Sequence, residues 1–460
     1  MGNLGPGWKQ IQIDPGRMEN YRSNAERDRI SADDAKSAAF DLKRIFTSTK
    51  TSDTLETKFK NAWKILEEKS FSEIGSIAKE YKENFLLGGV SRESNLPERS
   101  HLDPNMESIG KVLAEARGNL PHGYYQRLAM LVREKLISEI PEQSQRASNE
   151  FLKEGSNLEI GRVQTRTLQN GRTYEIYIPR SVNAFDDNGE LKIPTIVGLH
   201  GVLTDREVPG AMRNMAGLNM LADRLGFAVI YPHAESRHAL GKLNLAGWNI
   251  KDSVNILPRK DSYDDTEVIR EMIADVRSQI NVTDKVGMIG HSDGGRMAQF
   301  YAMRHPEEVA AIVPITSTWM QGDRKPEHTT PIPTRFIIGN KDNTLPFEGG
   351  RGWRSWAYSM VVSNNSYKSR PKEMLSNWAA INGCDDTPPT VNKSGIVESL
   401  FANCTGAPMR IDLVKGGGHP VPDWRNIDTL RPEAVELNLS YDAVKWVLPY
   451  IRQTDKRTQV

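Results

Sequence analysis

The spacing of apolar residues along the chain changes near residue 157. Before that point, apolar side chains recur at i, i+3, i+4 and i+7, for example over 59–66 and 128–140, which predicts amphipathic helices. The first residues, 1–30, are polar with little periodicity and predict a flexible polar arm. Residues 31–155 are therefore expected to form a helical region, in which no motif indicates chemistry.

After this change, short apolar runs alternate with segments of helical period over residues 156–455. Such alternation, with strands that are apolar throughout, is typical of a mostly parallel sheet covered by helices on both faces. Residues 163–168 and 173–178 flank a Gln-Asn-Gly turn and predict an antiparallel hairpin at the start of this α/β domain. The other predicted strands are 195–199, 227–231, 286–289, 310–315, 335–338 and 409–414, with helices near 211–225, 264–280, 294–304, 369–381 and 441–451.

One strand-to-helix junction carries the pattern G-x-S-x-G, with Ser292 between Gly290 and Gly294. A strand before and a helix after this pattern are the context of a nucleophile elbow, a sharp turn that presents a serine hydroxyl. Glycine is needed on both sides because the flanking backbones pass close together. We therefore predict Ser292 as a nucleophile.

A serine hydroxyl needs a general base, and the base needs an acid that orients it. In sheets that carry a nucleophile elbow, these residues follow in the order Ser, Asp or Glu, His. Asp342 comes just after the predicted strand 335–338, and His419 follows strand 409–414 and three glycines. We predict that Ser292, Asp342 and His419 form a catalytic triad, which needs neither a metal ion nor an organic cofactor.

The oxyanion of an acyl-transfer reaction needs backbone N–H donors. The residue after the nucleophile, Asp293, supplies one, and the His-Gly sequence after strand 195–199 suggests Val202 as the other. Further candidates adjoin the elbow or the polar segment 233–263 and could line a substrate cleft. They are His200, Trp248, Asp265 and His291; Trp248 could equally be a core residue, and Asp265 could start a helix.

Net charge and the lengths of the apolar runs give no reason to expect nucleic acid as a partner or a membrane span. A net charge of +1 gives no electrostatic reason to expect nucleic acid as a ligand. No apolar run approaches the roughly 20 residues of a membrane span. The N-terminus lacks the apolar stretch of a signal peptide, so we expect a cytoplasmic protein or export by a non-classical route.

The chain has two cysteines, Cys384 and Cys404. Two cysteines cannot form a four-cysteine zinc site. They are either a pair of free thiols or one disulfide, which would indicate an oxidising compartment. The missing signal peptide argues against the disulfide.

Six motifs in the region 157–452 occur in an order that resembles the polyhydroxybutyrate depolymerase and feruloyl esterase branch of the α/β-hydrolases. The motifs are Leu199-His200-Gly201, Gly247-Trp248-Asn249 with Asp264-Asp265, Gly290 to Gly295, Gly339 to Gly350, Trp378 to Cys384, and Gly416 to His419. The resemblance implies an α/β-hydrolase fold, with the family's nucleophile, acid and base on Ser292, Asp342 and His419. It also implies that Cys384 and Cys404 form the family's disulfide.

Three positions depart from the family pattern. Asp293 replaces a small or neutral residue after the serine, Val202 replaces a frequent cysteine, and Pro420 follows the histidine where aromatic residues are common. A carboxylate at Asp293 is expected to disfavour negatively charged acyl groups by like-charge repulsion.

The expected function is hydrolysis of carboxylic esters through an acyl-enzyme, with a small-molecule or polymeric ester as substrate. A serine peptidase or acyltransferase would use the same triad, and an inactive hydrolase fold could serve as a binding or scaffold protein. The N-terminal helical region is a candidate for binding a protein partner, and the oligomeric state stays open.

Overall fold

The computed structural model describes residues 146–452 except 188, 205–207, 241–242, 252, 254–262, 326–328, 351–367, 395–396, 415–416 and 420–438. The arm predicted over 1–30 and nearly all of the helical region predicted over 31–155 lie outside the described residues.

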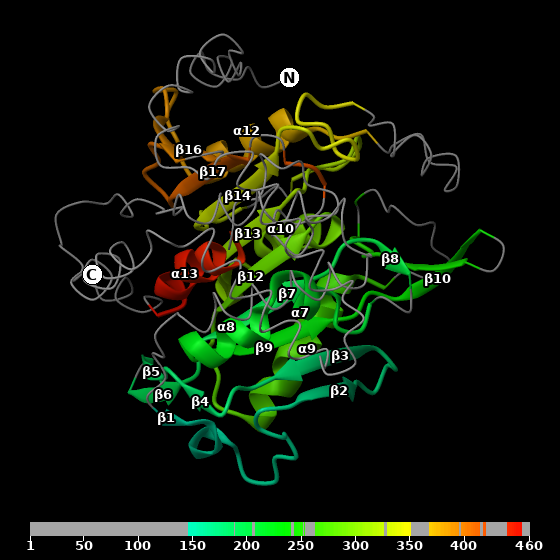
Figure 1. Cartoon of the computed structure of the whole chain (residues 1–460), viewed down its shortest axis with the longest axis vertical. Helices are drawn as coiled ribbons and strands as arrows, with labels where there is room; N and C mark the ends of the chain where they lie inside the picture. Colours follow the sequence, from blue (N-terminus) through cyan, green and yellow to red (C-terminus); the bar gives the residue numbers. More distant parts are fainter. Residues whose placement is uncertain are drawn as a thin grey trace, which may run out of the picture.

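The described residues form a ten-stranded sheet that runs through the whole body (Figure 1). Neighbouring strands from β9 to β17 are parallel, and antiparallel strands extend the sheet at both ends. The strand order is β2 (Val163–Thr167), β3 (Thr173–Tyr177), β9 (Ala228–Pro232), β7 (Thr195–Leu199), β12 (Val286–His291), β13 (Val309–Ile315), β14 (Thr334–Gly339), β17 (Met409–Val414), β16 (Val397–Ala402) and β15 (Thr390–Ser394).

Helices cover both faces of the sheet, so the central strands are buried along their full length. One apolar cluster joins the sheet to α9 (Asp265–Gln279), α10 (Asp293–Arg304) and α12 (Pro371–Ile381). A second cluster on the opposite face includes α8 (Leu218–Leu225) and α13 (Leu439–Arg452). Burial on both faces explains why these strands have continuous apolar sequences instead of alternating ones.

The structure differs from the predicted elements in three details. The helix expected over 211–225 is divided into α7 (Ala211–Ala216) and α8 by Gly217, whose φ of 60° ends the first helix. The hairpin of β15 and β16 was not predicted. Small pieces of sheet also form between β8 (Leu203–Thr204), β10 (Ser236–Leu240) and β11 (Leu243–Ala246), between β5 (Phe185–Asp187) and β6 (Glu190–Lys192), and between β1 (Arg146–Ala147) and β4 (Ser181–Val182).

The α/β body includes residues before 156, the position at which the sequence predicted that it begins. β1 pairs with β4, and the 3-10 helix Ser148–Phe151 follows it directly. Phe151 is 4% exposed and packs in the main apolar cluster. The segment 146–155 therefore belongs to the α/β body and not to a separate helical region.

Candidate active site

Ser292 occupies the turn between β12 and α10 in a strained backbone conformation. Its φ is 54° and its ψ is −120°, values that a residue with a side chain rarely adopts. Its N–H donates to the carbonyl of Ile315 at 2.9 Å, which extends the pairing of β12 with β13 by one residue. The hydroxyl is thereby held at the carboxyl end of β12, as the elbow motif predicts.

The two glycines of the motif are required by close backbone contacts. A Cβ atom on Gly290 would lie 2.3 Å from the carbonyl oxygen of Gly294. A Cβ atom on Gly294 would lie 2.2 Å from the carbonyl oxygen of Leu199, at the end of β7. Only glycine lets α10 begin this close to the neighbouring strand end.

The structure brings Ser292, His419 and Asp342 into one hydrogen-bonded chain. The Ser292 hydroxyl lies 2.8 Å from Nε2 of His419, and Nδ1 of His419 lies 2.8 Å from Oδ2 of Asp342. Asp342 follows β14 and His419 follows β17, so the three residues come from separate strand ends. In this arrangement the Nδ1–H of His419 donates to Asp342, which leaves Nε2 to accept the serine proton.

The carboxylate of Asp342 is fixed by the turn in which it lies. Its other oxygen, Oδ1, accepts the N–H groups of Thr344 and Leu345, both at 2.7 Å. The residue is 5% exposed. With one oxygen held by two backbone donors, the other faces the imidazole in a defined direction.

The loop after β7 lies directly against the nucleophile. A Cβ atom on Gly201 would be 3.0 Å from Cβ of Ser292. The next side chain, Val202, packs against Met320 and Leu345. Because α10 begins at Asp293, the N–H of Asp293 has no acceptor within the helix. The predicted oxyanion donors, the N–H groups of Val202 and Asp293, belong to this loop and to the start of α10, and their role stays a prediction.

The side chain of Asp293 does not face the nucleophile, which corrects the expected like-charge repulsion. Its Oδ2 accepts the N–H of Trp248 at 3.0 Å, and Oδ1 lies 3.4 Å from the guanidinium of Arg296. Arg296 also donates from Nε to Oδ2 of Asp323 at 2.6 Å. Burial raises the pKa of Asp293, and the charge of Arg296 opposes this shift. The carboxylate of Asp293 thus joins the segment at Trp248 to the first turn of α10.

Two candidate cleft residues prove to be part of the interior. Trp248 is 1% exposed, and its indole N–H donates to the carbonyl of His200 at 2.7 Å. Asp265 is fully buried; it lies 2.6 Å from the guanidinium of Arg172 and accepts the N–H of Asn249 at 2.7 Å. Both side chains are engaged by the protein, so the expectation that they line an open cleft is corrected.

His200 and His291 are both buried and uncharged. His200 donates from Nδ1 to the carbonyl of Gly201 at 2.6 Å and accepts the N–H of Ala234 at Nε2. Burial lowers the pKa of His200 to about 4 and that of His291 to about 3. Nε2 of His291 donates to the carbonyl oxygen of His419 at 2.8 Å. The sequence did not indicate this contact with the predicted general base.

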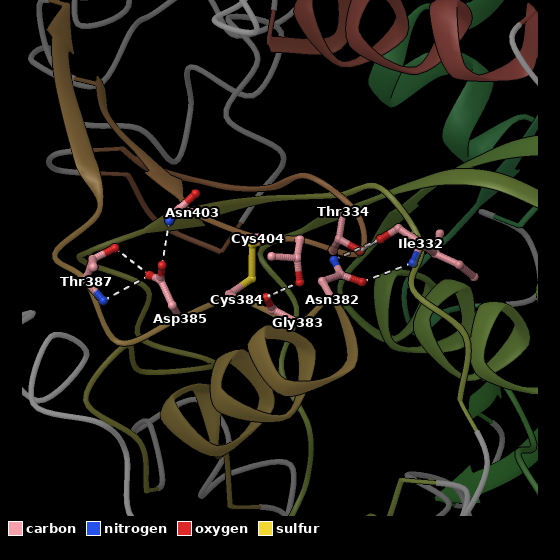
Figure 2. The surroundings of a disulfide bond; sticks show 10 residues. Ile332, Thr334, Asn382, Gly383, Cys384, Asp385, Thr387, Asn403 and Cys404 are labelled. Atoms are coloured by element: carbon pink, nitrogen blue, oxygen red, sulfur yellow. Dashed lines mark hydrogen bonds between the residues drawn. A yellow bond between two sulfur atoms is a disulfide. The ribbon is translucent and has the colours of Figure 1, made fainter. Parts of the chain in front are cut away.

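Cys384 and Cys404 form a disulfide between the end of α12 and the end of β16 (Figure 2). Next to it, Asn382 accepts the N–H of Ile332 at 3.0 Å and donates to the carbonyl of Ile332 at 2.9 Å. Ile332 precedes β14, so the disulfide lies at the amino end of the parallel strands. Asp342 lies at their carboxyl end.

Within the described ranges, no group of three His, Cys, Asp or Glu side chains could hold a metal ion. No helix in the described part of the chain is long and apolar enough to cross a membrane.

A mostly parallel sheet with a serine elbow is the architecture of the α/β-hydrolase fold. The model of the alpha/beta hydrolase fold family matches residues 236–355, from β10 to the segment beyond Asp342. The protein therefore has the α/β-hydrolase fold, and its sequence is similar to those of esterases.

Two curated relatives carry that similarity. NocK from Nocardia uniformis subsp. tsuyamanensis, a protein assigned as an esterase, is 29% identical over 157 residues, 34% of this chain and 42% of that protein. Feruloyl esterase B from Piromyces equi is 27% identical over 180 residues, 37% of this chain and 32% of that enzyme. The chain thus matches less than half the length of these relatives.

Among solved structures, the chain aligns with an acetyl xylan esterase from Aspergillus awamori at 17% identity and a TM-score of 0.38. The alignment covers 58% of this chain and 100% of that structure.

Proposed function

We propose that the protein hydrolyses carboxylic esters through an acyl-enzyme on Ser292. The observation that carries this proposal is the chain of two 2.8 Å hydrogen bonds from Ser292 through His419 to Asp342. The bonded residues are separated by 127 and 77 positions in the sequence, so local sequence does not account for their meeting. Similarity to two esterases supports the same reaction class.

In the proposed reaction, His419 takes the Ser292 proton as the hydroxyl oxygen attacks the ester carbonyl. Asp342 keeps the Nδ1–H tautomer of His419 and stabilises the imidazolium that forms. The N–H groups of Asp293 and Val202 stabilise the oxyanion. The imidazolium then protonates the leaving alcohol, and water attacks the acyl-enzyme with His419 again as base.

A fluorophosphonate probe tests the assignment of the nucleophile. The wild-type protein should become labelled on one peptide, which contains Ser292, and Ser292→Ala should lose both the label and hydrolysis of p-nitrophenyl acetate. Circular dichroism of both proteins verifies that the fold is kept. Labelling and turnover that persist in Ser292→Ala would refute the proposal. Matched anilide and ester substrates separate a peptidase from an esterase.

For the substrate, we propose short or hydroxylated acyl groups over long lipid chains. A pocket of about 330 Å³ is lined by the turn 170–173, residues 208–209 and segment 233–236, which place Arg172, His233 and Glu235 beside apolar Val208 and Pro209. It adjoins the active-site loops because the N–H of Ala234 donates to His200, next to Gly201. None of the triad residues lines it.

This substrate preference is tested with p-nitrophenyl acetate, butyrate and palmitate, together with methyl ferulate and soluble hydroxybutyrate oligomers. We expect kcat/KM to be higher for acetate and butyrate than for palmitate. Highest efficiency on palmitate would refute the preference, and the last two substrates distinguish the two branches of the resembled family.

A further inference from the structure

The main-chain carbonyl of His419 accepts two hydrogen bonds from side chains. Nε2 of His291 donates to it at 2.8 Å, and Oγ1 of Thr316 donates to it at 2.8 Å. A carbonyl oxygen has two lone pairs, so these donors use its full capacity. Neither contact belongs to the triad itself.

Both donors lie at the ends of adjacent parallel strands. His291 ends β12 and pairs in register with Ile315, the last residue of β13; Thr316 follows directly. Thr316 has a φ of 42°, and its N–H donates to Ile337 at 2.7 Å. Of the non-glycine residues that the structure describes, only Ser292 and Thr316 have positive φ. The second strained residue thus stands one strand away from the first and contacts the predicted base.

Just before His419 the structure describes Gly417 and Gly418, and Gly417 donates its N–H to the carbonyl of Val414 at 3.2 Å. These two glycines have no side chains that could pack against the body. The carbonyl of Gly417 accepts the N–H of Lys341 at 2.9 Å. Asp342 fixes the imidazole ring of His419, but a ring can turn about its own side-chain bonds when the backbone that carries it shifts.

We propose that His291 and Thr316 are positioning residues that hold the main chain of His419, so that the base is fixed at its backbone as well as at its ring. This inference rests on the proposed function and adds two residues to it. Asp342 sets the tautomer and direction of the imidazole, and the two donors set the position from which it reaches Ser292.

The environment of His291 suits it to this position. Burial lowers its pKa to about 3, so the ring stays neutral and keeps one proton, on Nε2. Its centroid lies 5.3 Å from that of His419, which becomes positively charged when it takes the serine proton. A charged donor such as lysine at position 291 would oppose that step by like-charge repulsion. A neutral imidazole provides the hydrogen bond without this repulsion.

The test compares substitutions that remove each donor with substitutions that keep it. Thr316→Val and His291→Leu remove the hydroxyl and the N–H with little change in volume, and each should lower kcat about tenfold, since small misplacements of catalytic groups cost one to two orders of magnitude. KM should change less than about twofold, because neither side chain is placed on the substrate. Thr316→Ser and His291→Gln keep a donor and should restore most of the rate.

Thr334→Val provides the matched control for Thr316→Val. Thr334 is also buried, and its hydroxyl donates to the carbonyl of Ile332 at 2.7 Å. It lies at the amino end of β14, whereas Thr316 lies at the carboxyl end of β13. Both valine variants lose one buried hydrogen bond to a carbonyl and should lose similar stability. Only Thr316→Val should lose kcat. Equal losses of kcat in both would show a general effect of destabilisation and overturn the proposal.

The rate of phosphonylation by the fluorophosphonate probe separates this inference from the proposed function. That single step needs Ser292 and His419 but no ester substrate, so it should slow in Thr316→Val and His291→Leu by the same factor as kcat. Wild-type rates of phosphonylation and turnover in both variants would overturn the positioning role and leave the triad intact. A wild-type protein that the probe does not label would instead refute the proposed function.

Discussion

The two edges of the parallel sheet are built in different ways. At the carboxyl edge, Ser292 and Thr316 have positive φ, and a Cβ on Gly294 would touch a neighbouring backbone. At the amino edge, a disulfide joins Cys384 to Cys404, and Asn382 pairs with both backbone groups of Ile332. Strained backbone persists only where surrounding structure over-determines it. The carboxyl edge therefore holds strained backbone that positions the predicted triad at a cost in stability. The amino edge holds contacts that increase stability.

The largest expected effect is on catalysis, from Asp342→Asn at the carboxyl edge. The amide cannot hold the Nδ1–H tautomer of His419, so kcat should fall by about 10⁴-fold. Kinetics with p-nitrophenyl acetate measure this loss, and thermal unfolding should show a folded protein. Turnover within tenfold of the wild type would mean that another carboxylate orients the base.

Alanine substitutions of two glycines, one in the elbow and one in β12, test the difference between the two edges. In Gly294→Ala the new Cβ would meet the carbonyl oxygens of Leu199 and His200 at 2.2 and 2.4 Å, so the elbow must shift and activity should be lost. In Gly287→Ala, near the amino end of β12, it would meet Cγ1 of Val447 at 2.1 Å. We expect the second variant to lose about 1–3 kcal/mol of stability but to keep its kcat at 25 °C. Similar losses of kcat in both would contradict the distinction.

Acid should destabilise the protein through histidines at the carboxyl edge. His200 follows β7, His233 follows β9 and His291 ends β12; burial lowers their pKa values to about 4, 4 and 3. In the unfolded chain these groups titrate near 6.5. Between about pH 6.5 and 4 the unfolded state therefore binds more protons, and the free energy of unfolding falls as the pH decreases.

Each of these histidines contributes up to about 1.4 kcal/mol per pH unit within this window. Urea unfolding at a series of pH values between 7 and 4 measures the slope. His291→Gln should make the slope shallower by up to one proton. A slope unchanged in that variant would show that His291 is not held neutral by the fold.

The smallest effect on catalysis is expected from removing the disulfide at the amino edge. The disulfide closes a segment with a sequence separation of 20, so Cys384→Ser with Cys404→Ser should cost about 3 kcal/mol. The kcat at 25 °C should stay within twofold, because the bridge lies at the opposite end of the strands from Ser292. Unfolding in urea and steady-state kinetics check the two parts. A tenfold loss of kcat with little loss of stability would reverse the roles assigned to the edges.

The central sheet could be predicted from sequence, and candidate triad residues could be chosen, because each has a local signature. Buried parallel strands are apolar throughout, and the elbow needs glycine on both sides of Ser292. Asp342 and His419 could be chosen because each follows a predicted strand in the expected order. The meeting of these three residues is a prediction of topology, and the structure places them within hydrogen-bond distance.

The directions of individual side chains could not be predicted from the sequence. Asp293 was expected to repel negatively charged acyl groups, but its carboxylate contacts Arg296, three residues along α10, and the N–H of Trp248 in the interior. Trp248 lies in the polar segment 233–263 and Asp265 begins the helix that follows it, yet both are buried by partners distant in sequence. The contacts of His291 and Thr316 with His419 depend on pairing between β12 and β13, which no local pattern encodes.

In the proposed reaction, Ser292 forms the acyl-enzyme. The most direct measurement is mass spectrometry of protein quenched with acid within milliseconds of mixing with p-nitrophenyl acetate. We predict one acetyl group per chain, on the peptide with Ser292, in step with a burst of p-nitrophenol. An acetyl group on another residue, or turnover with neither burst nor acetylation under conditions where acylation is fast, would contradict it.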